Sequence, residues 1–155
     1  MMNGAQNAYF EASMNSASPL QLVALLYQAG EDAARDALRH LEGGDIAGRA
    51  RQIGKVSAVI LELSTSLDHA RGGEVSVRLA ALYHYMLDRL TQANLEQTAE
   101  PLCEVIALLE TLGGAWRELA GKENEPPAAE YVTSGDWRGL HEDLADGSRA
   151  FACSF

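Results

Sequence analysis

The chain has 155 residues and a formal net charge of −10, and its length suits one domain with room for a tail. This acidity argues against nucleic-acid binding, because phosphates must be neutralised by a basic surface, and an anionic membrane would also repel the chain. Alanine and leucine are abundant whereas β-branched residues are sparse, so the composition favours helices over strands.

The sequence predicts neither membrane insertion nor a secretory signal. No window holds the roughly 18 uninterrupted apolar residues of a membrane-spanning helix. The N-terminus lacks the basic segment and apolar run of a signal peptide. The two cysteines, Cys103 and Cys153, do not resemble a disulfide framework. We therefore expect a cytoplasmic protein, beginning with an arm over residues 1–17.

The first helix is predicted from Pro19 to about Leu41. Ser18 can cap this helix with its hydroxyl group, and Gln21 completes a capping box. Pro19 suits the first helical position, where its missing N–H is not needed. Gly43-Gly44 ends the helix.

Three further helices follow at short intervals. Asp45 is a plausible cap for the second helix, whose apolar face extends to Leu67. Gly72-Gly73 breaks the chain, and a third helix is expected from about Glu74. Thr98 can cap the fourth helix.

These four helices predict an all-α fold. Connections of a few residues force neighbouring helices to run antiparallel, so we expect an antiparallel up-down four-helix bundle over residues 18–122. The apolar stripes are wide enough to leave some apolar surface uncovered, which suggests a partner site. Residues 123–155 form a linker and a C-terminal extension, with Trp137, Leu140 and Leu144 at the spacing of a short amphipathic helix.

No motif predicts catalysis, a metal or a cofactor. A di-iron bundle would need Glu-x-x-His pairs, and the sequence has none. The paired glycines close helices and do not form a phosphate-binding loop. The run Tyr83-His84-Tyr85 does not converge on one site, because consecutive helical residues point in different directions. We expect a protein that is not an enzyme.

Four sequence pieces occur in a distinctive order. They are S-x-S-P-x-x-L-x-x-L-L-Y over residues 16–27, Gly-Gly-Glu over residues 72–74, L-Y-x-Y-M-x-x-x-L-x-x-A-N over residues 82–94, and Trp116 near the end of the last bundle helix. In this order and spacing they resemble the flagellin-specific export chaperones of bacterial flagella, over about residues 5–120.

The resemblance implies a cytoplasmic chaperone that binds the C-terminal segment of flagellin. Covering this segment would prevent premature polymerisation, and the chaperone would then deliver flagellin to the flagellar export gate. The alternative is a helical-bundle adaptor or regulator that binds another export substrate or an anti-sigma factor.

Eight residues are candidates for binding the partner. Tyr27 and Tyr83 are favoured because tyrosine suits a half-exposed interface, whereas each leucine fits the core equally well. In the resembled family, a tyrosine of the arm covers the groove and takes part in docking to the export gate, and Tyr9 is the candidate for that role. The full set is Tyr9, Leu22, Leu26, Tyr27, Leu79, Leu82, Tyr83 and Met86.

The extension suggests a further hypothesis. Residues 128–155 carry too many large apolar side chains for a purely solvating tail. We hypothesise that the extension docks on the bundle through Trp137 and Leu140 and competes with flagellin. A tail that packs elsewhere, or is disordered, is weighted equally.

Overall fold

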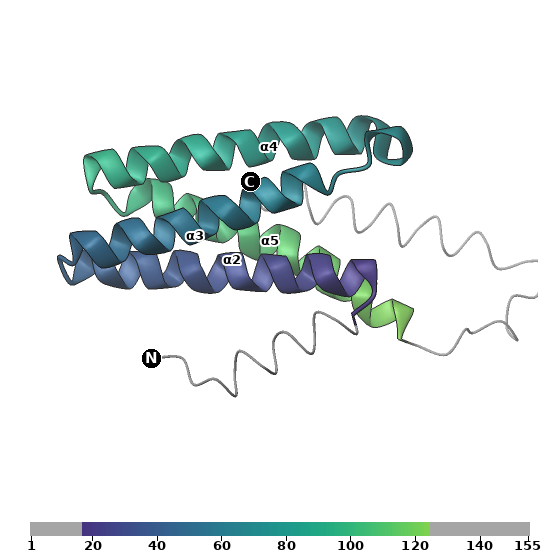
Figure 1. Ribbon diagram of the computed structural model, residues 1–155, viewed down its shortest axis with the longest axis horizontal. Helices are drawn as coiled ribbons and strands as arrows, with labels where there is room; N and C mark the ends of the chain where they lie inside the picture. The colour runs from purple at the N-terminus through teal and green to yellow at the C-terminus, as the bar shows by residue number, and fades with distance from the viewer. Residues whose placement is uncertain (1–16, 125–155) are drawn as a thin grey trace, which may run out of the picture. The chain divides into compact units, whose positions relative to one another are not determined.

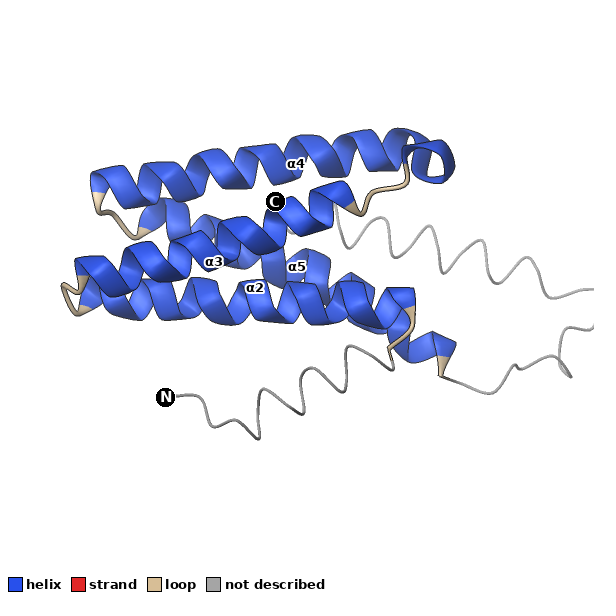
Figure 2. Ribbon diagram, in the orientation of Figure 1, coloured by secondary structure: helices blue, strands red, loops and turns tan. Residues whose placement is uncertain are grey.

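Four helices make up nearly all of the chain that the structure describes. The structure is a computed structural model, and it describes residues 17–124, so the predicted arm with Tyr9 and the extension with Trp137 and Leu140 lie outside the described residues. No strand occurs between residues 17 and 124, and the predicted all-α fold is confirmed. The helices are α2 (Pro19–Glu42), α3 (Ile46–Thr65), α4 (His69–Glu96) and α5 (Glu100–Glu123), as Figures 1 and 2 show.

The predicted caps of the first two helices are confirmed. The Ser18 hydroxyl accepts the backbone N–H of Gln21 at 3.3 Å, and the Gln21 side chain accepts the N–H of Ser18 at 3.0 Å. The Asp45 carboxylate accepts the N–H of Gly48 at 2.9 Å at the start of α3. These contacts satisfy N–H groups that have no partner within the helix, and each such cap stabilises its helix by about 1 kcal/mol.

The boundaries around α4 differ from the prediction. Helix α3 ends at Thr65, before Leu67, and α4 begins at His69 instead of near Glu74. The reason is Asp68, whose carboxylate accepts two backbone N–H groups and thereby starts a helical turn ahead of the glycine pair. Gly73, with φ 51° and ψ −126°, still interrupts the helix, so the predicted break lies inside α4.

The start of α5 also differs by one residue. The helix begins at Glu100, and the carbonyl of Ala99 accepts the N–H of Cys103 at 2.9 Å. Ala99 therefore occupies the cap position that was predicted for Thr98. Pro101 lies in the first turn, where its missing N–H costs no helical hydrogen bond.

All four helices contribute to one apolar core. Helix α3 packs against both α2 and α4, and successive helices run in opposite directions, as predicted (Figure 1). Alanine and glycine on α2 allow close approach: a Cβ at Gly30 would lie only 3.2 Å from Val59 Cγ1 on α3. Fully buried large side chains of the core are Tyr27, Val56, Ile60, Tyr83, Met86, Leu90, Leu102, Val105 and Leu109.

None of the helices between residues 17 and 124 is both long enough and apolar enough to cross a bilayer.

Candidate functional site

Three of the predicted site residues lie in the core. The side chains of Tyr27, Tyr83 and Met86 are 0%, 2% and 0% exposed. The expectation that the two tyrosines are half-exposed is therefore wrong. A tyrosine ring can be fully buried when its hydroxyl group has a partner, and here the two hydroxyl oxygens lie 2.5 Å apart.

The buried tyrosine pair connects three helices. The Tyr27 hydroxyl also bonds the Trp116 side chain, whose indole N–H can only donate. Tyr27 therefore accepts from Trp116, and either tyrosine can donate in the bond between the two hydroxyl groups. Burial, followed by the bond to Tyr83, raises the pKa of Tyr27, and burial raises the pKa of Tyr83. Three of the residues that carried the family resemblance thus meet in one cluster.

Leu22 and Leu26 line a groove between α2 and α3. This α2–α3 groove has a volume of about 410 Å³. Leu79 and Leu82 on α4 are half-buried against the core and do not line it. The structure therefore brings together one pair of the predicted leucines and leaves the other pair elsewhere. The lining residues of the α2–α3 groove are Pro19, Leu22, Val23, Leu26, Glu62 and Ser66.

A second groove follows the other side of α2, between α2 and α5. This α2–α5 groove has a volume of about 440 Å³, and sequence reasoning did not predict it. The described part of its lining is mostly small or apolar, with Arg117 as its charged residue. The lining residues are Ala17, Gln21, Ala24, Leu25, Gln28, Arg117 and Ala120.

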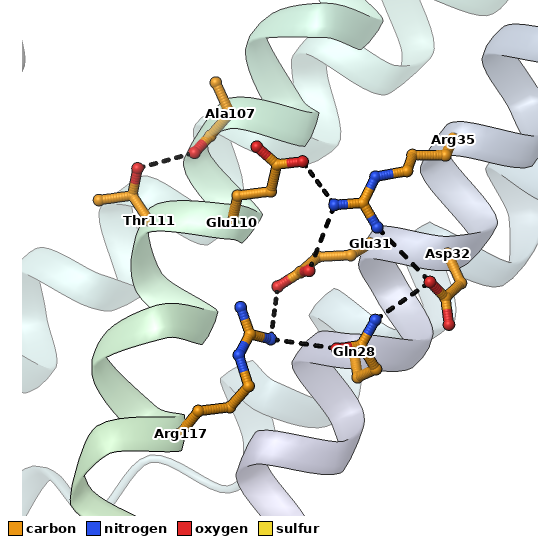
Figure 3. Close-up of polar contacts among 8 residues, drawn as sticks. All are labelled: Gln28, Glu31, Asp32, Arg35, Ala107, Glu110, Thr111 and Arg117. Atoms are coloured by element: carbon orange, nitrogen blue, oxygen red, sulfur yellow. Dashed lines mark hydrogen bonds and ion pairs between the residues drawn. The ribbon is translucent and has the colours of Figure 1, made fainter.

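The buried carboxylate of Glu31 contacts Arg117, which lines the α2–α5 groove, and Figure 3 shows the two side chains. Glu31 is 2% exposed, and its Oε1 atom accepts from Arg117 Nη1 at 2.9 Å. Its Oε2 atom lies 3.6 Å from Arg35 Nη2, and Arg35 in turn donates to Glu110 at 2.5 Å. Two arginines therefore compensate the buried charge and connect α2 to α5.

Gly113 makes this arrangement possible. A Cβ atom at this position of α5 would lie 2.3 Å from Glu31 Oε1 and 3.1 Å from Arg117 Nη1. Any side chain would therefore displace the carboxylate from its arginine. The pairing of Glu31 with Arg117 therefore depends on the absence of a side chain at Gly113.

Other apolar side chains remain exposed on the bundle. Val75 and Val77, which follow the break at Gly73, are 65% and 62% exposed, and Leu61 on α3 is 54% exposed. This agrees with the expectation that the helices leave apolar surface uncovered.

The run Tyr83-His84-Tyr85 does not form a site, as expected. Tyr83 lies in the core, whereas His84 and Tyr85 are exposed. The Tyr85 hydroxyl donates to Glu104, which also accepts from Arg89 Nε at 2.7 Å. The hydrogen bond from Tyr85, followed by the contact with Arg89, lowers the pKa of the Glu104 carboxyl. Within residues 17–124, no three His, Cys, Asp or Glu side chains lie together as potential metal ligands.

Comparison with known proteins finds relatives over most of the chain. The profile of the family described as flagellar protein FliS matches residues 1–123. The flagellar secretion chaperone FliS of Salmonella typhimurium is 36% identical over 113 residues, which cover 72% of this chain and 84% of the relative. The flagellar secretion chaperone FliSB of Pseudomonas aeruginosa is 36% identical over 115 residues, which cover 74% of this chain and 91% of the relative. FliS of Campylobacter jejuni is 33% identical over 121 residues, which cover 78% of this chain and 94% of the relative.

Proposed function

The chain belongs to the family of the flagellar protein FliS, and on that premise we propose that it is a cytoplasmic flagellar secretion chaperone that binds flagellin. The observation that carries this proposal is the extent of the match, because residues 1–123 include all four helices of the bundle. Relatives that carry the name flagellar secretion chaperone match over 72% and 74% of the chain.

We infer that the C-terminal segment of flagellin binds in apolar grooves of the bundle. Grooves on both sides of α2 offer apolar walls of the kind that receive an amphipathic helix. Leu22 and Leu26 are the predicted residues that would contact flagellin directly in the α2–α3 groove. Half-buried Leu79 and Leu82 would form a separate contact on α4.

The buried candidates have a different role in this proposal. Tyr27, Tyr83 and Met86 are covered by other side chains, so they would support the walls of the grooves without touching flagellin. Tyr9 remains the candidate for contact with the flagellar export gate, and it lies outside the described residues.

The chaperone would act by binding alone. Flagellin polymerises through its terminal segments, so covering one segment blocks assembly before export. Ordering a disordered segment consumes about 2–5 kcal/mol or more of the gross interaction energy, which leaves moderate affinity and allows later release. This mechanism requires no catalytic step and no cofactor.

Calorimetric titration with flagellin tests the proposal. The full chain should bind flagellin at one-to-one stoichiometry with a negative change in heat capacity, because apolar surface is buried. Flagellin without its C-terminal segment should bind much more weakly. Equal binding of the two forms would contradict the proposal, and tight binding of an anti-sigma factor instead would favour the adaptor alternative.

A further inference from the structure

We propose that the α2–α5 groove is a carboxylate-binding subsite, in which Arg117 pairs with an acidic group of the bound segment. The inference rests on the proposed function in taking flagellin as the partner. To that proposal it adds the chemical group that the groove binds, which is a carboxylate next to small apolar side chains.

One residue carries the charge of the described groove lining. Among the described residues that line the groove, Arg117 alone is charged, and the others are apolar or amides. Arg117 pairs with the buried Glu31, and in a chain with a net charge of −10 it is the one cation that the described lining of this groove presents to an occupant. Such a cation attracts a carboxylate and repels a lysine or arginine of a competing segment.

The guanidinium group of Arg117 uses only one of its nitrogens for contacts with the described residues (Figure 3). Nη1 of Arg117 donates to Glu31 Oε1 at 2.9 Å and to Gln28 Oε1 at 3.3 Å. Among the described residues, all hydrogen bonds of Arg117 come from this one nitrogen, and its side chain is 39% exposed. The remaining donors, on Nη2 and Nε, are therefore available to a ligand, and a guanidinium fork matches the two oxygens of a carboxylate.

The guanidinium group of Arg117 is held in place by its two acceptors. Glu31 is buried and also contacts Arg35, so it fixes the inner side of Arg117. Gln28, the second acceptor, is itself held by a hydrogen bond from its Nε2 to Asp32 Oδ1 at 3.1 Å. An arginine that is fixed before binding loses less conformational entropy when it pairs with a ligand.

Desolvation then decides which segment can occupy the groove. Any occupant would exclude water from the exposed donors of Arg117. A purely apolar segment would leave these donors without partners, which is costly, whereas a carboxylate would satisfy them. The favoured occupant is therefore a stretch of the flagellin C-terminal segment that carries a side-chain or terminal carboxylate beside small apolar residues.

A double-mutant cycle tests the inference with the full chain. The probes are two synthetic peptides of the flagellin C-terminal segment. One has natural carboxylates, and the other has every Asp and Glu replaced by its amide and an amidated C-terminus. Against the natural peptide, Arg117→Gln should weaken binding about tenfold, in the range typical of a hydrogen bond between charged groups. Against the amide peptide, Arg117→Gln and the unchanged protein should bind alike.

Arg39→Gln is the matched control, because it removes the same charge near the opposite end of α2 from an exposed side chain. It should bind both peptides like the unchanged protein. Equal weakening by Arg39→Gln and Arg117→Gln would overturn the inference. Arg117→Lys, which keeps a cation for Glu31 but lacks the fork, should show an intermediate loss.

Binding of the two peptides to the protein without substitutions tests the inference independently of whether any variant folds. It should bind the natural peptide about tenfold more tightly than the amide peptide. If it binds both equally, flagellin binding stands but the carboxylate subsite is wrong, and the groove receives an apolar segment or none. If it binds neither the peptides nor flagellin, the proposed function is wrong, and the inference fails with it.

Discussion

Two hydroxyl groups at the centre of an apolar core are stable only because they satisfy each other. Tyr27 and Tyr83 come from α2 and α4, and the 2.5 Å contact of their oxygens joins helices that are far apart in the sequence. Trp116 extends the contact to α5. The pair therefore specifies how three helices align, since a shift of any one would leave a buried hydroxyl group without a partner.

Removing one hydroxyl group should reveal the strength of the tyrosine pair. Tyr83→Phe leaves the Tyr27 hydroxyl without its tyrosine partner, so we expect the free energy of unfolding to fall by about 1–3 kcal/mol. Tyr83→Ala also creates a cavity and should cost about 3–5 kcal/mol. Urea denaturation measures both. Tyr85→Phe, at an exposed position, is the control, and an equal effect of Tyr85→Phe and Tyr83→Phe would contradict the prediction.

The same pair predicts a loss of stability in alkaline solution. The pKa values of Tyr27 and Tyr83 are raised in the folded protein, whereas an unfolded tyrosine ionises near pH ~10. Below about pH 10 both states are neutral, and above it the unfolded state loses protons that the folded state keeps, so stability falls as pH rises. The double variant Tyr27→Phe, Tyr83→Phe should lose less stability between pH ~9 and ~11 in urea denaturation. Parallel losses in the two proteins would show that the tyrosines are not responsible.

Within the helices, two glycines make room for side chains of neighbouring helices. Gly30 makes room for Val59 and Leu109, and Gly113 makes room for the carboxylate of Glu31. Glycine weakens an isolated helix by about 1 kcal/mol relative to alanine. At these two positions, this cost is offset by the packing and the ion pair that the missing side chain allows.

Neighbouring glycines of α5 should therefore respond to alanine in opposite ways. A Cβ at Gly113 meets Glu31 Oε1 at 2.3 Å, so Gly113→Ala should displace the buried ion pair and destabilise the protein by at least about 2 kcal/mol. A Cβ at Gly114 meets no atom within 4 Å, so Gly114→Ala should stabilise it by about 0.5–1 kcal/mol. Thermal unfolding measures the stability of both variants. If the unfolding temperature changes in the same direction in both, the packing argument is wrong.

The bundle as a whole was predictable from the sequence to a large extent. Caps at Ser18 and Asp45 and the glycine break near residue 73 mark the elements through local backbone chemistry, which sequence shows directly. The start of α4 was missed because the strong glycine signal concealed the capping by Asp68. The hydropathy pattern placed Met86 on an apolar face of its helix, but it did not show that Met86 is fully buried in the core.

The candidate site was less predictable, for a physical reason. Periodicity identifies the apolar face of each helix, whereas a groove depends on the gap that remains after two helices have packed. Leu22 and Leu26 were found because they belong to a motif, but Arg117 carries no local signal. Its significance arises only from the contact with Glu31, which is 86 residues away in the sequence.

We predict that the bundle folds independently of the extension. All buried apolar residues of the described chain lie between Tyr27 and Ala120, and the family match ends at residue 123. A chain truncated after Asn124 should therefore unfold at the same temperature as the full chain in calorimetry. The competition hypothesis for the extension predicts, in addition, that the truncated chain binds flagellin more tightly, because a tethered competitor acts at millimolar effective concentration. Unchanged affinity would disprove competition, and a lowered unfolding temperature would show that the bundle is not independent.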